Sequence, residues 1–273
     1  MSEIAGTDML PVDQSDLSQQ GGTITRNILG VDVQVLDGSQ AIDEVERAVA
    51  AGSHKKIAFL NAHGANIAYQ DHDYQAVLDK FTVLADGIGV DIGSKMLYRE
   101  PFPENLNGTD FIPRLFSEIS SPLKVGLFGA GKDVAIHAVR MLSEQFPNHA
   151  FEMIGDGYFE TADEEQVIKK LQADPPDVLL VALGNPIQEK WIAKNCTGHH
   201  ARVAIGVGAL FDFTSGRVRR APEWMISLRI EWLFRLLLEP GRMWKRYVLG
   251  NPLFLFRIMK QKIFGLSGQK RPR

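Results

Sequence analysis

Residues 81–89 read FTVLADGIG, an apolar run that stops at Asp86 and is followed at once by Gly87 and Gly89. Short apolar runs without alternation are typical of parallel strands that are covered on both faces. In open α/β sheets, ligands bind at the carboxyl ends of such strands. The stretch therefore predicts a buried strand that carries a carboxylate to a functional edge of a sheet.

The same pattern recurs along the chain. Residues 57–60 run into Asn61, residues 125–128 into Gly129-Ala130-Gly131, and residues 178–182 into Gly184-Asn185. Helical stretches separate these runs, and this alternation predicts an α/β fold with a Rossmann-like, mainly parallel sheet and helices on both faces. The expected strands are 28–36 (a strand or hairpin arm), 56–61, 81–85, 125–128, 151–154, 177–183 and 203–207, and the expected helices include 39–51, 64–79 and 164–172.

The chain divides into three expected parts. Residues 1–22 are polar and acidic and predict a disordered tail, and residues 23–216 form the α/β catalytic domain. From residue 217 the strand signals cease, and helical spacing over 224–238 and a basic, aromatic stretch over 242–264 predict a C-terminal helical appendage. Residues 217–273 hold 14 Lys and Arg against three Asp and Glu, whereas residues 1–216 hold 16 against 30. A basic appendage on an acidic body predicts an anionic partner.

Composition excludes several classes of protein. With 273 residues, of which 45% are hydrophobic and 23% charged, the chain can bury a large core. The single Cys196 excludes an intramolecular disulfide framework and a multi-cysteine zinc site, and it favours the cytoplasm. No secretory signal is visible, and no uninterrupted apolar stretch reaches the ~20 residues that span a bilayer.

Two motifs have weak functional interpretations. Residues 126–132 approach a P-loop, but Asp133 follows where Ser or Thr would bind magnesium, and Val134 stands where a dinucleotide fingerprint needs its third glycine. Asp71-His72-Asp73 has the form of a cation-binding D-x-D, yet it lies in or beside a polar helical stretch, which favours a solvated surface pair. We therefore predict no metal site.

Several polar residues should share one sheet edge: Asn61, Asp86, the glycines Gly129 and Gly131, and Gln188. Together they would form a nucleotide-sugar pocket with one carboxylate base. Other interpretations stay open at this point. Asp86 taken alone is better suited to a turn or a helix cap. The glycines are equally suited to phosphate approach or a tight turn, and Gln188 and Glu189 could instead cap the next helix.

The chain resembles the WecG/TagA/CpsF glycosyltransferases through motifs that run in family order from about residue 57 to 247. These motifs are Asn61, residues 85–89 (ADGIG), 107–110 (NGTD), 155–159 (GDGYF), 183–189 (LGNPIQE), 206–208 (GVG), 220–224 (RAPEW), 231–235 (EWLFR) and 239–242 (EPGR).

The resemblance implies a bacterial enzyme that moves a sugar from a UDP-sugar to an undecaprenyl-diphosphate-linked saccharide. It implies inversion at the anomeric carbon, with no metal and no cofactor, since the UDP-sugar is a substrate. Asp86 matches the family's proposed general base, and Asn61 and Gln188 match polar residues of the donor pocket, with Gly184 and Asn185 in the same motif as Gln188. Among the appendage arginines, we expect Arg220, Arg229 and Arg235 to contact diphosphate.

Two departures bear on the substrate. Phe59 stands where many members have Thr, and Asn105 stands where many have Arg, both near the presumed substrate contacts. The Asn105 version is similar to members in exopolysaccharide pathways that add glucose, so UDP-glucose is the expected donor. The alternative is N-acetylmannosamine or its uronic acid.

Partners and location follow from the appendage. Trp244, Tyr247 and Phe254 lie among Lys and Arg, which favours an anionic membrane surface over nucleic acid. We expect a cytoplasmic enzyme held at the inner face of the cytoplasmic membrane, and a homo-oligomer stays open. Two other functions compete: a nicotinamide-dependent oxidoreductase and a non-catalytic adaptor.

Overall fold

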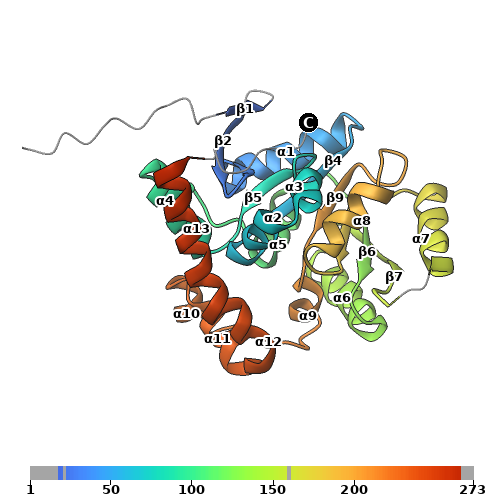
Figure 1. Cartoon of the computed structure of the whole chain (residues 1–273). Helices are drawn as coiled ribbons and strands as arrows, with labels where there is room; N and C mark the ends of the chain where they lie inside the picture. Colours follow the sequence, from blue (N-terminus) through green and yellow to red (C-terminus); the bar gives the residue numbers. More distant parts are fainter. Residues whose placement is uncertain (1–17, 21–22, 159–160, 266–273) are drawn as a thin grey trace, which may run out of the picture.

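A six-stranded parallel sheet forms the centre of the computed structural model, which describes residues 18–20, 23–158 and 161–265. Its strand order is β5-β4-β9-β8-β6-β7 (Figure 1). The strands are β4 (Lys55–Leu60), β5 (Thr82–Ala85), β6 (Lys124–Gly129), β7 (Ala150–Gly155), β8 (Val178–Ala182) and β9 (Val203–Gly206). The predicted α/β fold is confirmed.

Helices cover both faces of this sheet (Figure 1). In β4, Ile57 and Phe59 enter one hydrophobic core, while Ala58 and Leu60 enter the other. Burial on both faces explains why the strands lack polar alternation. The helices that contribute buried side chains to the first core are α1 (Gly38–Ala50), α5 (Gly108–Glu118), α6 (Lys132–Gln145) and α9 (Leu210–Thr214). Those that contribute to the second core are α2 (Ala62–Gln70), α3 (His72–Leu78), α4 (Ile88–Tyr98), α7 (Thr161–Ala173) and α8 (Ile187–Asn195).

A small antiparallel sheet precedes the main one. It consists of β1 (Ser18–Gln20), β2 (Thr23–Ile28) and β3 (Val31–Gln34). The hairpin-arm interpretation of residues 28–36 is confirmed by β3, but the arm is shorter than predicted because the chain turns at Leu29 and Gly30, which have φ of 52° and 90°. Asn27 accepts a hydrogen bond from the Gly30 N–H and fixes this turn. Apart from β1, the expected tail lies outside the described residues.

The helix predicted over 64–79 is two helices, α2 and α3. The Asp71 side chain accepts from the Tyr74 N–H at 2.9 Å and caps α3, and it also pairs with Lys190 at 2.6 Å. Local capping by Asp71 therefore ends one helix and starts the next. The sequence pattern also did not predict α4, which begins directly after Gly87, a residue with φ of 85°.

Five helices form the C-terminal part of the chain that the structure describes. They are α10 (Glu223–Ser227), α11 (Glu231–Leu238), α12 (Pro240–Trp244), the π-helix η2 (Lys245–Leu249) and α13 (Gly250–Phe264). The single helix predicted over 224–238 is wrong, because Arg229 adopts a φ of 58° and separates α10 from α11.

The last helix, α13, packs against α2 and α4 (Figure 1). Arg257 donates two 2.9 Å hydrogen bonds to Asn66 and lies 4.5 Å from the centre of the Tyr69 ring. At the far end of α13, Gln261 accepts from the Leu29 N–H. These contacts hold the C-terminal helices beside the sheet's functional edge. The domain boundary at residue 217 stays a prediction.

Candidate active site

A cleft of about 950 Å³ lies between the carboxyl ends of the strands and the C-terminal helices. Most of the predicted site residues line it: Asn61, Asp86, Asn105, Gly131, Gly184, Asn185, Gln188, Arg229 and Arg235. Gly129 and Arg220 are not among the lining residues. The parallel sheet therefore brings residues from six separate segments into one cavity, as the strand-end pattern predicts.

Asp86 follows β5 directly, and Asn61 follows the neighbouring strand β4. The Asn61 Nδ2 donates to Asp86 Oδ2 at 3.0 Å. At the same time, the Asn61 Oδ1 accepts from the Gly64 N–H at 3.0 Å and caps α2. The cap fixes the orientation of the amide, so its N–H₂ group faces the carboxylate. Asp86 itself caps no helix, since α4 begins after Gly87.

Burial raises the pKa of Asp86 above its usual range. The hydrogen bond from Asn61 and the charges of Arg246 and Arg235 oppose this shift only in part. A carboxylate with a raised pKa is a stronger base than a solvated aspartate. The site can therefore accept a proton at Asp86.

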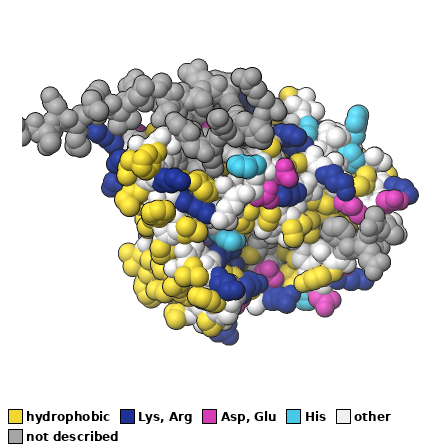
Figure 2. Space-filling view, viewed as in Figure 1, with side chains coloured by type: hydrophobic (Ala, Val, Ile, Leu, Met, Phe, Trp, Pro, Cys, Tyr) yellow, Lys and Arg dark blue, Asp and Glu magenta, His cyan; other side chains and the backbone are white. Residues whose placement is uncertain are grey.

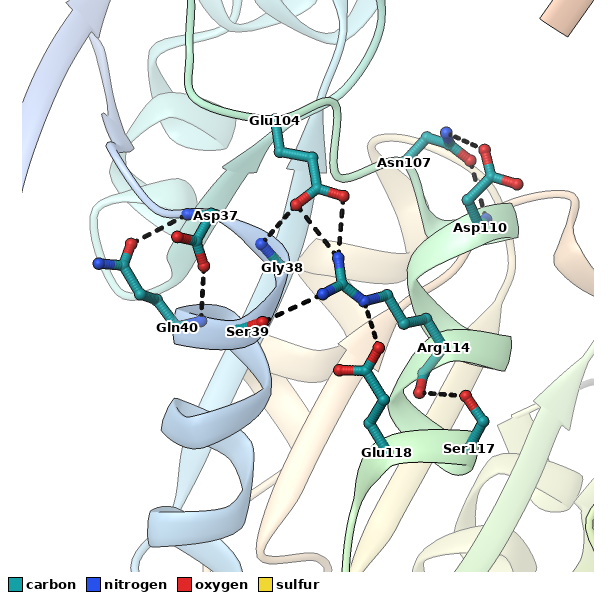
Figure 3. A network of polar contacts seen from close by, with 10 residues as sticks. All are labelled: Asp37, Gly38, Ser39, Gln40, Glu104, Asn107, Asp110, Arg114, Ser117 and Glu118. Atoms are coloured by element: carbon teal, nitrogen blue, oxygen red, sulfur yellow. Dashed lines mark hydrogen bonds and ion pairs between the residues drawn. The ribbon is translucent and has the colours of Figure 1, made fainter. Parts of the chain in front are cut away.

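The loop that carries Asn105 is held at both sides. The Asn105 Oδ1 accepts from the Gly87 N–H at 2.6 Å, next to Asp86. The neighbouring Glu104 accepts from the Gly38 N–H at 2.8 Å and from Arg114, as Figure 3 shows. Arg114 in turn donates to Glu118, so the loop is tied to the first turn of α1 and to α5. This network positions Asn105 at the cleft.

The two predicted glycines have different surroundings. Gly129 has φ of 118°, and a Cβ there would lie 2.5 Å from the carbonyl oxygen of Ala182 in β8. Its small size is thus required by the close approach of β6 and β8. Gly131 lines the cleft and stands at the N-terminus of α6 without a side-chain cap, where helix amide groups favour an anion.

The three predicted arginines also differ. Arg235 lines the cleft, with its guanidinium 5.0 Å from the centre of the Phe213 ring. Arg229 lines the cleft too, but it pairs with the buried Asp91 of α4. Arg220 does not line the cleft, but it pairs with Asp110 of α5, which does. Two of the three therefore tie the C-terminal helices to the sheet domain.

Residues 26–268 match the sequence profile described as the glycosyl transferase WecG/TagA/CpsF family. The chain belongs to this family. It is therefore a sugar-transferring enzyme, and the oxidoreductase and adaptor hypotheses are abandoned.

Relatives of this glycosyltransferase carry a more specific name. A protein of Bacillus subtilis (strain 168) is 37% identical over 76% of this chain and 79% of its own length. A protein of Staphylococcus aureus (strain MRSA252) is 28% identical over 90% of this chain and 96% of its own. Both are named N-acetylglucosaminyldiphosphoundecaprenol N-acetyl-beta-D-mannosaminyltransferase. These names favour the alternative donor, N-acetylmannosamine, over UDP-glucose and an exopolysaccharide pathway.

Two further residues of this glycosyltransferase, Arg246 and His63, line the cleft, although the sequence did not point to them. The Arg246 Nε is buried and has no hydrogen-bond partner among the described residues. Burial and the charge of Arg246 lower the pKa of His63 to about 4, so its imidazole is neutral at pH 7. His63 lies two residues after Asn61, a spacing that places it in the first turn of α2. Nothing in the spacing singles out Arg246, because it lies in η2.

Proposed function

We propose that this enzyme transfers N-acetylmannosamine from UDP-N-acetylmannosamine to N-acetylglucosaminyl-diphosphoundecaprenol, with inversion. The names of both relatives support this acceptor and this sugar. The observation that carries the proposal is the half-buried Asp86, which lies in a polar cleft beside Asn61 and near two arginines.

Asp86 is the general base of the proposed reaction. It takes the proton from the acceptor hydroxyl while that oxygen attacks the anomeric carbon of the donor. The new glycosidic C–O bond forms as the bond between the anomeric carbon and UDP breaks, and attack from the opposite face inverts the configuration. A positioned base of this kind contributes roughly 10²–10⁴-fold to the rate. Asn61 holds the carboxylate in place for this step.

The UDP that leaves gains negative charge, which Arg235 and Arg246 offset in the proposed mechanism. Guanidinium groups match diphosphate oxygens bidentately, and both arginines line the cleft. The N-terminus of α6 at Gly131 offers further N–H groups. We propose that these groups suffice without a metal ion or a cofactor.

The C-terminal helices are the proposed membrane contact. Figure 2 shows hydrophobic side chains gathered over the region where Figure 1 places α10–α13. Trp224, Leu237, Phe256 and Phe264 are each at least 60% exposed there. Basic residues accompany them, as expected of a segment that lies on anionic lipid. Among the described residues, no helix has the length and hydrophobicity to cross a bilayer. We propose peripheral binding at the inner face of the cytoplasmic membrane.

A transfer assay tests the proposed function. Synthetic N-acetylglucosaminyl-diphosphopolyprenol is incubated with UDP-N-acetylmannosamine, UDP-glucose or UDP-N-acetylglucosamine, with and without EDTA. We expect transfer from UDP-N-acetylmannosamine that EDTA leaves unchanged. Preferred transfer of glucose would contradict the proposed donor, and loss of activity in EDTA that added metal restores would contradict the metal-free mechanism.

A further inference from the structure

Glu189 is a fully buried carboxylate in the first turn of α8, and the proposed mechanism does not use it. Its Oε1 accepts from the Asn185 Nδ2 at 2.9 Å and from the Gln188 Nε2 at 2.7 Å. Both donors belong to residues that line the cleft. A buried carboxylate is costly unless its partners are well placed, so its position at this cleft requires an explanation.

Glu189 determines which way both amides face. The Glu189 Oε1 accepts both hydrogen bonds, so each amide must turn its N–H₂ group toward Glu189. The Gln188 Oε1 is then directed to the Gly184 and Gly208 N–H groups, at 3.1 and 3.0 Å. Gln188 is 2% exposed, and its carbonyl joins the loops that follow β8 and β9.

Asn185 is oriented in the same way but remains open to the cleft. One of its Nδ2 protons goes to Glu189 and the other to the Tyr74 hydroxyl at 3.3 Å. Within the described residues, no group donates to the Asn185 Oδ1. Asn185 therefore offers the cleft an acceptor and no donor.

Asn185 lies at the reacting end of the cleft. A Cβ placed on Gly64 would meet the Asn61 Oδ1 at 3.8 Å and the Asn185 Nδ2 at 4.0 Å, so both side chains flank the same point of α2. Asn61 in turn contacts Asp86. A ligand group at Asn185 would thus lie near the proposed base, at the end of the cleft where the sugar is proposed to react.

We propose that Glu189 is a positioning residue that fixes Asn185 as a hydrogen-bond acceptor for a sugar hydroxyl or N-acetyl N–H beside Asp86. This inference rests on the proposed function and goes beyond it, since it assigns a sugar contact to Asn185 and an orienting role to Glu189. The sugar group comes either from the donor or from the acceptor saccharide, and kinetics separate the two.

The test compares Glu189→Gln, Asn185→Ala and the double variant. Gln keeps the shape of Glu but carries both a carbonyl and an N–H₂ group. It can therefore pair with either end of the Asn185 amide and no longer fixes the direction of the Asn185 Oδ1. We expect each single variant to lower kcat/KM by roughly tenfold, the size of one hydrogen bond to a neutral group. The double variant should match Asn185→Ala alone, because the proposed effect of Glu189 on the sugar passes through Asn185, and an effect through Gln188 would appear as a further loss in the double variant. A rise in KM for the UDP-sugar assigns the contact to the donor, and a rise in KM for the lipid assigns it to the acceptor.

UDP binding, measured by calorimetry, is the control, because UDP lacks the sugar. Its Kd should stay within about twofold in all variants. Full activity of Glu189→Gln, effects that multiply in the double variant, or an equal loss of UDP affinity would each overturn the inference. If Glu189→Gln does not fold, Tyr74→Phe replaces it, with a smaller loss that vanishes in the Asn185→Ala background. A wild-type enzyme that is inactive with every donor would contradict the proposed function instead. In that case the variants are compared by how much more tightly each binds UDP-N-acetylmannosamine than UDP, and an unchanged ratio would overturn the inference.

Discussion

Asn61 donates to Asp86 with one end of its amide and caps α2 with the other, so a single side chain couples a helix start to the carboxylate in the cleft. Neighbouring parallel strands place the two residues side by side, although 25 positions separate them in sequence. The amide cannot flip without losing both contacts.

Replacing Asn61 should shift the pH dependence of transfer. The Asn61 hydrogen bond favours the ionised form of Asp86 and lowers its pKa, although burial keeps the pKa raised overall. Asn61→Ala removes this donor, so the acidic limb of kcat/KM should move to higher pH. The variant also loses the cap of α2, which costs about 1 kcal/mol of stability.

Asn61→Asp is the matched control. Its carboxylate can still cap α2, but it places a second negative charge beside Asp86, which disfavours ionisation. The acidic limb should move upward without the same loss of stability. An acidic limb that does not move in either variant would contradict a coupling between Asn61 and Asp86.

Replacing Arg246 should reduce transfer and UDP binding more than replacing an arginine outside the cleft. Arg246→Gln removes a guanidinium that lines the cleft and whose charge acts on Asp86, so kcat/KM and UDP affinity should both fall by at least tenfold. Arg219→Gln is the control, because Arg219 is exposed and is not among the residues that line the cleft. Equal losses in the two variants would indicate a general effect of charge instead.

The positions of the strand-end residues could be predicted from the sequence, whereas the directions of the arginine side chains could not. Asn61 and Asp86 directly follow apolar strands, and a parallel sheet fixes where strand ends lie. The orientation of Arg229 depends on its own positive φ, and that of Arg246 on the π-helix η2. A π-helix changes the direction in which the side chains after it point. The spacing of apolar residues in the sequence predicts neither the positive φ nor the π-helix.

Glu189 and Asp71 also differ from what their sequence positions suggest. Glu189 follows an apolar strand and looks like a capping residue, yet α8 begins at Ile187 and the carboxylate is buried among amides. Its role depends on contacts with Tyr74, more than 100 positions away, which no local pattern encodes. The break at Asp71 arises from a local cap, and the Asp71 spacing to Tyr74 could have predicted it.

Stability should depend on the ionisation of Glu189. Burial raises the pKa of Glu189 to about 7 from 4.5, so the folded state binds its proton more tightly than the unfolded state does. The wild type should therefore lose about 3 kcal/mol relative to Glu189→Gln as the pH rises from 4.5 to 7. Urea unfolding across this pH range measures the difference, and parallel curves for both proteins would contradict it. Tyr74 and the Asp71–Lys190 pair also face this region, and both proteins retain them.

Membrane binding should depend on the exposed side chains of α13. Phe256→Glu places a charge where a 63% exposed ring would enter lipid, and binding to vesicles with anionic phospholipid should fall by roughly tenfold. Ile136→Glu is the control, because Ile136 is 49% exposed on α6, apart from the C-terminal helices (Figure 1). Vesicle flotation that separates neither variant from the wild type would argue against this surface.

The rate of sugar transfer by Asp86→Asn tests most directly the central claim that Asp86 is the general base. Glu231→Gln is the comparison, because Glu231 is another cleft carboxylate with a pKa raised by burial. We predict that Asp86→Asn lowers kcat by at least ~100-fold. The Kd for UDP should change little, and the variant should unfold at a temperature no lower than the wild type. An Asp86→Asn enzyme that keeps its rate, with Glu231→Gln inactive, would place the base at Glu231 and contradict the account.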